Sequence, residues 1–170
     1  MTATTESRVR EIDTPYEGLS STATADFNRD GYVRLSNVLS PETIAEYEPT
    51  ITSEVIRLNT QHLPLEERDT YGKAFLQVTN LWEHNDKVKE LVFSKRLAKI
   101  AADLLGVHSV RLYHDQALYK EPSGGITPWH ADQYYWPLSS DRTVTVWIPL
   151  QETPMEMGPL GFARGSHHLS

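Results

Sequence analysis

The chain contains no cysteine among its 170 residues, carries little positive charge and has no long apolar run. The missing cysteine excludes a disulfide scaffold, a thiolate metal site and a cysteine nucleophile, and favours a reducing, cytoplasmic location. Sixteen Lys and Arg against 23 Asp and Glu give a net charge of −7. We therefore predict no nucleic-acid partner, because phosphate contacts need clustered cations. No apolar run approaches the roughly 18 residues of a membrane span, so no membrane partner is predicted either.

Two kinds of sequence follow one another along the chain. Residues 1–21 are rich in Thr, Ser and Glu, which predicts a flexible N-terminal arm. Residues 22–106 show helical signals, and residues 107–170 show short β-type runs between turns. The last fifty residues hold five of the nine glycines and six of the ten prolines. We expect one domain over residues 22–170, with helices first and strands after them.

The helical part carries clear start and stop signals. Ser40 followed by Pro41 is a typical helix start, and an apolar stripe at steps of three and four follows it. Pro49 is expected to kink or interrupt that helix. Further helices are predicted to end at Gly31 and Gly106. The stripe consists of Ile44, Tyr47, Ile51, Val55 and Leu58.

The second part contains alternating runs. Residues 32–35 are a short strand candidate upstream of it. Along residues 112–120, Gln116 and Lys120 share one partly polar face, because strand side chains alternate. Along residues 143–150, threonines and Trp147 share one face and aliphatic residues the other. This pattern suits a barrel whose lumen holds a ligand, and equally a plain antiparallel sheet with one wet face.

The most informative triplet is His130-Ala131-Asp132. On a strand, residues i and i+2 point the same way, so an imidazole and a carboxylate can hold one metal. Two histidines and one carboxylate form the triad of non-haem Fe(II) oxygenases. With 7 histidines and 9 aspartates in 170 residues, chance alone gives about 0.4 triplets of the form His-x-Asp. A second one, His84 to Asp86, precedes a helical run and is explained by helix capping.

The ordered segments around this triplet resemble the phytanoyl-CoA dioxygenase family of Fe(II)- and 2-oxoglutarate-dependent oxygenases. The resemblance covers roughly residues 26–168 and is strongest over the last sixty. Its segments are FNRDGYVRLSNVLSPE, RLYHDQALYKEPSGG, TPWHADQYYWPL and RTVTVWIPLQETPMEMGPLGFARGSHH. The resemblance implies a mainly β fold with flanking helices (α+β), in which a double-stranded β-helix, a jelly-roll or cupin-like barrel, holds the active site.

The resemblance also implies roles for single residues. His130 and Asp132 are implied as catalytic residues and as two of three iron ligands, with Fe(II) and 2-oxoglutarate as cofactors. Lys120 and Trp147 correspond to positions near 2-oxoglutarate, although surface exposure or core packing explains each as well. Gln116 is a further cofactor-binding or pocket candidate. An aromatic group at Tyr134, Tyr135 and Trp136 is a candidate substrate lining.

Two parts of the family's pattern have no counterpart here: the distal histidine ligand and the arginine that anchors 2-oxoglutarate. After Asp132 the only histidines are His167 and His168, in a segment that is a loop in related sequences, and neither Arg142 nor Arg164 matches the anchor position. About four or five strand candidates compare with about eight in such a barrel. We therefore expect an N-terminal portion, with the C-terminal strands missing or supplied by a companion chain.

The sequence thus predicts a dioxygenase that uses O2 to hydroxylate a small organic molecule, with this chain alone inactive. Two alternatives stay open. One is a non-catalytic binding or regulatory module of the same fold, and the other is a cupin-type metal enzyme of different chemistry. The identity of the substrate is not predicted, because a fold does not fix function.

Overall fold

The computed structural model describes residues 9–169, which form a mainly helical chain with one two-stranded sheet. None of the helices in this part of the chain is long and apolar enough to cross a membrane. The helices and strands are α1 (Ser21–Asp30), α2 (Pro41–Leu58), α3 (Thr70–Ala74), β1 (Leu76–Thr79), α4 (Asp86–Val92), α5 (Lys95–Leu105) and β2 (Gln116–Tyr119). Short 3-10 helices are η1 (Glu11–Asp13), η2 (Leu65–Glu67), η3 (Leu81–Glu83), η4 (Asp132–Tyr135), η5 (Met155–Met157) and η6 (Ser166–His168).

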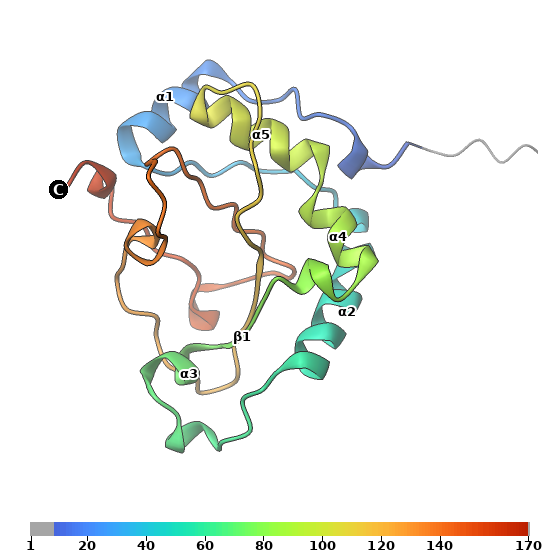
Figure 1. The fold of residues 1–170 in the computed structure, drawn as a ribbon, viewed down its shortest axis with the longest axis vertical. Helices are drawn as coiled ribbons and strands as arrows, with labels where there is room; N and C mark the ends of the chain where they lie inside the picture. The colour runs from blue at the N-terminus through green and yellow to red at the C-terminus, as the bar shows by residue number, and fades with distance from the viewer. Residues whose placement is uncertain (1–8, 170) are drawn as a thin grey trace, which may run out of the picture.

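The longer helices lie along the top and the right of the molecule in Figure 1, and the short α3 lies at the lower left. In Figure 1, α1 and α5 lie together at the top, and α4 and α2 run down the right side. The orange and red C-terminal segment runs through the left and centre of the same view. The helical first part and the irregular second part therefore occupy different regions of one molecule.

The predicted mainly β fold with a double-stranded β-helix barrel is wrong. Within residues 9–169 the only ladder joins β1 to β2, antiparallel, with Leu76 opposite Tyr119 and Thr79 opposite Gln116. Residues 143–150 and residues 32–35 form no strand. A strand needs a neighbour that accepts and donates its backbone hydrogen bonds. Alternation in a sequence sorts side chains onto faces but does not supply that neighbour.

The helix signals are confirmed. The Ser40 hydroxyl caps α2 by accepting from the Thr43 N–H, and Gly31 and Gly106 end α1 and α5 in the left-handed conformation. The prediction that Pro49 interrupts this helix is wrong, because α2 continues through Pro49. Burial of apolar residues on both sides of Pro49 outweighs the loss of one backbone hydrogen bond. The buried residues of α2 are Tyr47, Ile51 and Val55.

The core lies in the first part of the chain, between α2, the sheet and α4. Leu81 in η3 is fully buried and Tyr47 is 1% exposed. The exposed face of the sheet carries Gln77, Gln116 and Leu118, whereas Leu76 and Val78 point inward. The remaining members of the cluster are Ile12, Ile51, Val55, Val88 and Leu91.

Residues of the predicted N-terminal arm contribute to this core. Ile12 in η1 is 1% exposed, and its carbonyl accepts a hydrogen bond from the Ser94 hydroxyl at 3.0 Å. Residues 1–8 of the arm lie outside the described residues. The predicted boundary at residue 21 stays a prediction, while η1 packs with the helical part.

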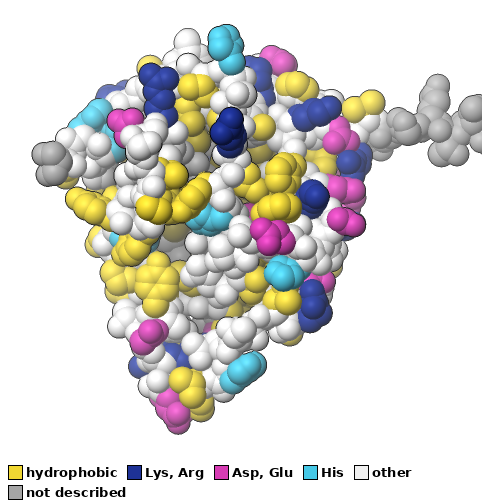
Figure 2. All heavy atoms as spheres, viewed as in Figure 1, with side chains coloured by type: hydrophobic (Ala, Val, Ile, Leu, Met, Phe, Trp, Pro, Cys, Tyr) yellow, Lys and Arg dark blue, Asp and Glu magenta, His cyan; other side chains and the backbone are white. Residues whose placement is uncertain are grey.

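The C-terminal segment covers the surface and contributes little to the core. After Leu104, no described residue is fully buried. Figure 2 shows hydrophobic side chains gathered on the left of the view, the side over which this segment runs. The exposed large apolar residues of the segment include Ile126, Trp129, Tyr134, Tyr135, Met155 and Phe162.

The end of this segment docks on the C-terminal end of α1. His167 Nε2 donates to the Asn28 carbonyl oxygen at 3.1 Å, because a carbonyl oxygen only accepts. Gly31 has φ +83°, and a Cβ placed there would lie 2.4 Å from His167 Nδ1. Phe162 stacks on Tyr32 with ring centroids 4.8 Å apart. Gly31 is therefore needed both for its backbone conformation and for the approach of His167.

Replacing Gly31 by alanine is expected to destabilise the protein by about 2 kcal/mol. Positive φ costs an L-residue about 1 kcal/mol or more, and the loss of the His167 contact adds about 1 kcal/mol. Gly106→Ala is the matched control, because Gly106 has φ +64° with nothing within 4 Å of its added Cβ. Urea unfolding measures both variants. Equal losses for the two would contradict a role for the His167 contact.

Glu11 joins η1 to the start of α2. Its Oε2 accepts from the Ser40 N–H at 2.8 Å and from the Thr43 hydroxyl at 2.7 Å. Arg96 approaches its Oε1 at 3.6 Å. Partial burial raises the pKa of the Glu11 carboxyl. The hydrogen bonds from Ser40 and Thr43 and the charge of Arg96 together lower it by more, so the pKa lies below its ordinary value.

This lowered pKa predicts acid sensitivity. The folded protein favours the Glu11 carboxylate, so its stabilisation is complete above the unfolded pKa, about 4.3. It is lost as the pH falls through the lower folded pKa. Glu11→Gln is expected to cost about 1 kcal/mol at pH 7 and to flatten the loss of stability between neutral and acid pH. Urea midpoints measured from pH 7 to pH 3 test this, with the exposed Glu66→Gln as control. An unchanged pH profile in Glu11→Gln would refute it.

Candidate metal centre

The His130 and Asp132 side chains face one another. His130 Nε2 lies 3.3 Å from Asp132 Oδ1, and both side chains are partly exposed. Asp132 begins η4, so the pair does not lie on a strand as predicted. Ala131 between them is nevertheless extended, with φ −114° and ψ 126°. One extended residue is enough to put its two neighbours on the same side, which is why the spacing argument works outside a sheet.

The backbone fixes which ring nitrogen of His130 faces the carboxylate. Nδ1 lies 2.8 Å from the Pro128 carbonyl oxygen. A carbonyl oxygen only accepts, so Nδ1 carries the proton and donates it. Nε2 is then the nitrogen that holds a lone pair in the neutral ring. It lies 3.3 Å from Asp132 Oδ1, and an imidazole nitrogen beside a carboxylate oxygen is a donor set that suits a divalent transition metal.

The pair offers two candidate ligands, and among the described residues no third His, Asp or Glu forms a cluster with it. Within residues 9–169 there is no cluster of three or more His, Asp or Glu side chains that could hold a metal ion. His167 and Arg164 are engaged elsewhere, at the end of α1, where Arg164 Nε lies 3.5 Å from Asp30 Oδ1. The described residues therefore bring together two candidate ligands, and a third His, Asp or Glu ligand is not among their clusters.

The second triplet has the structural role expected of it. The Asn85 side chain accepts from the backbone N–H groups of Lys87 and Val88, at 2.9 and 3.3 Å. Asn85 is therefore the N-cap of α4. His84 and Asp86 flank this cap.

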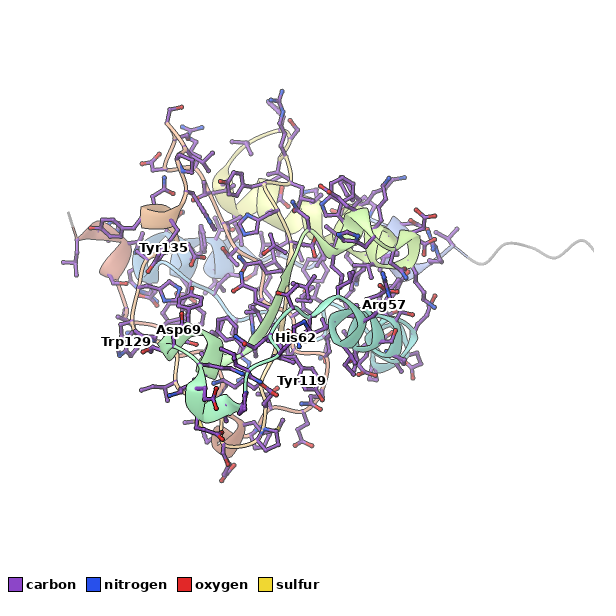
Figure 3. All side chains as sticks on the ribbon, turned by 60° about the horizontal axis from the view of Figure 1, so that its bottom comes forward. Arg57, His62, Asp69, Tyr119, Trp129 and Tyr135 are labelled. Carbon is purple, nitrogen blue, oxygen red and sulfur yellow. The ribbon has the colours of Figure 1, made fainter. Side chains whose placement is uncertain are left out.

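The three aromatic candidates have different surroundings. The edge of Tyr135 meets the His130 ring, with centroids 5.8 Å apart and planes at 78°. Tyr134 is 86% exposed. Trp136 instead packs against His114, with centroids 5.8 Å apart. Figure 3 places Tyr135 and Trp129 on the same side of the molecule, opposite Arg57 of α2.

Each of the cofactor-binding candidates has surroundings of its own. Lys120 Nζ donates to the Gly125 carbonyl at 2.8 Å. Gln116 lies on the exposed face of β2, and Trp147 is 43% exposed. Among the described residues, no hydrogen bond or ion pair joins these three side chains to His130 or Asp132. Their roles stay predictions.

Sequence reasoning missed one partner of the pair. The Thr145 hydroxyl donates to Asp132 Oδ2 at 2.8 Å. Two residues earlier, the Thr143 hydroxyl donates to Gln133 Oε1 at 2.9 Å. The alternating run placed both threonines on one face, but nothing in the sequence indicated that this face meets residues 132 and 133.

Comparison with known proteins identifies the class. The chain matches the phytanoyl-CoA dioxygenase (PhyH) family over residues 27–170, and it belongs to that family. Members of this family typically use Fe(II) and 2-oxoglutarate. The resemblance inferred from the sequence is therefore confirmed.

One relative shows how much of a whole protein this chain corresponds to. The chain is 26% identical over 147 residues to a probable alpha-ketoglutarate-dependent hypophosphite dioxygenase from Stutzerimonas stutzeri. The matched region covers 81% of this chain and 50% of the relative, so the chain spans about half the length of that protein. No solved structure matches the chain.

Proposed function

We propose that this chain provides the His130 and Asp132 ligands of an Fe(II)- and 2-oxoglutarate-dependent dioxygenase that oxidises a small organic molecule. The observation that carries the proposal is the convergence of His130 Nε2 and Asp132 Oδ1, 3.3 Å apart, in a chain of the PhyH family. When bound, iron with 2-oxoglutarate would supply the oxidation of substrate by O2. Hydroxylation is the proposed outcome.

The chain's own residues would hold and orient these groups. The Pro128 carbonyl keeps the Nδ1 proton in place, so His130 presents Nε2. Lys120, a compact cation, is proposed to attract the 2-oxoglutarate carboxylates, with Trp147 and Gln116 beside the same cosubstrate. Lys120 would have to exchange its bond to the Gly125 carbonyl for that role. Tyr134, Tyr135 and Trp136 are proposed to line the substrate site.

The remaining iron ligand and the anchor of 2-oxoglutarate are proposed to come from outside residues 9–169. They would be supplied by another part of the full-length protein or by a companion chain. This agrees with the two candidate ligands that the described residues bring together and with the share of the relative that the chain covers.

The test is succinate formation by the full-length protein with Fe(II), 2-oxoglutarate and O2. Succinate that requires all three supports the proposal. Anaerobic calorimetric titrations, first with Fe(II) and then with 2-oxoglutarate, separate the alternatives. Metal binding without 2-oxoglutarate binding or succinate would indicate a cupin-type enzyme of other chemistry. Binding of neither would indicate a non-catalytic module, and either outcome would overturn the proposal.

A further inference from the structure

The two carboxylate oxygens of Asp132 have different surroundings. Oδ1 faces His130 Nε2 at 3.3 Å. Oδ2 accepts the hydroxyl proton of Thr145 at 2.8 Å. A carboxylate whose oxygens are distinguished in this way presents one oxygen to a metal and keeps the other in the protein.

We infer that Thr145 is a positioning residue for the metal centre. Its hydroxyl holds Oδ2 so that only Oδ1 faces His130 Nε2. This inference rests on the proposed function, because it concerns the same site. The Thr145 hydrogen bond then determines whether Asp132 binds the metal through one oxygen or through both.

The number of Asp132 oxygens bound to the metal affects how many coordination positions stay open. In the triad of non-haem Fe(II) oxygenases, three positions stay open for other ligands. A carboxylate that binds through both oxygens occupies one of them. Without the Thr145 hydroxyl, the Asp132 carboxylate is free to turn about its terminal torsion, which is broad for aspartate. Both the orientation of Oδ1 and the number of open positions would then change.

A second threonine makes a contact of the same kind two residues earlier, but with a different partner. The Thr143 hydroxyl donates to Gln133 Oε1, and Gln133 Nε2 donates to the Ser140 carbonyl at 3.1 Å. Threonines 143 and 145 thus attach their segment to two consecutive residues, Asp132 and Gln133. Only the Thr145 bond ends on the carboxylate, which makes Thr143 a matched control.

The experiment measures Co(II) binding to the full-length protein, by calorimetry and by the visible absorption of the bound ion. Thr145→Val keeps the shape of the side chain and removes the hydroxyl. It is expected to weaken Co(II) binding about tenfold, the effect of losing a group that orients a ligand, and to shift the visible bands. Thr145→Ser keeps the hydroxyl and should stay within about threefold of the wild type. Thr143→Val should do the same.

The outcomes are distinguishable. If Thr145→Val binds Co(II) like the wild type with the same spectrum, or if Thr143→Val is equally weakened, the inference about Thr145 is overturned. A loss of binding in His130→Ala would leave the proposed function intact in that case. If His130→Ala itself binds Co(II) like the wild type, the proposed site fails, and with it the inference.

Discussion

His130→Ala and Asp132→Ala are each expected to lower 2-oxoglutarate turnover by the full-length protein at least about 100-fold. Removing an orienting partner of a metal ligand typically costs 10- to 100-fold, so removing a ligand costs at least as much. Both variants should also bind Fe(II) weakly, because each leaves only one of two donors that lie 3.3 Å apart. Both side chains are partly exposed, so folding should be little affected.

The chain contains its own control for this prediction. His84 and Asp86 have the same spacing, but the Asn85 between them caps α4. His84→Ala should therefore keep turnover and Fe(II) affinity within about twofold of the wild type. Succinate assays and anaerobic Fe(II) titrations measure both properties. Full activity in His130→Ala, or equal losses in His84→Ala, would contradict the assignment of the metal site.

The largest effect on stability is expected at Leu81. Its side chain is fully buried, and it lies in η3, which follows β1 and precedes α4 along the chain. Leu81→Ala should lower the free energy of unfolding by about 3 kcal/mol, from lost burial and from the cavity that remains. The backbone of the next residue, Trp82, donates to Asp115 Oδ1 at 3.3 Å, so a shift of η3 would also disturb the approach to β2.

Leu63→Ala is the control for Leu81, because Leu63 is 50% exposed. It should cost about 1 kcal/mol or less. Urea unfolding followed by circular dichroism measures both variants. A loss below about 1 kcal/mol in Leu81→Ala would mean that the core is not centred on η3.

The helices could be predicted because their signals are local. A hydroxyl at Ser40 and an amide at Asn85 cap the helices that follow them, and Gly31 and Gly106 end helices in a conformation that glycine adopts without strain. Each signal acts within a few residues. Such a signal can therefore be recognised in the sequence without knowing any distant contact.

The fold class could not be predicted in the same way, because a sheet depends on distant partners. Residues 143–150 alternate like a strand, yet their backbone is paired with no neighbouring strand, and their threonine hydroxyls bond to the side chains of Asp132 and Gln133. The barrel expectation came from the family resemblance together with this alternation. The structure of residues 9–169 contains only the β1–β2 pair.

The candidate site was predictable in part, for the same reason. His130 and Asp132 are two residues apart, so one extended residue between them brings them together. Thr145 reaches Asp132 from thirteen residues away, through a loop whose path the sequence does not specify. The roles of Lys120, Gln116 and Trp147 likewise depend on how separate segments meet, and they stay predictions.

The central claim is that His130 and Asp132 bind one iron together. Anomalous diffraction at the iron absorption edge, from crystals of the full-length protein loaded with Fe(II) without oxygen, tests it most directly. The account predicts one anomalous peak at bonding distance from both His130 Nε2 and Asp132 Oδ1, with Oδ2 still bonded to Thr145. A peak coordinated by other side chains, with none between His130 and Asp132, would contradict it.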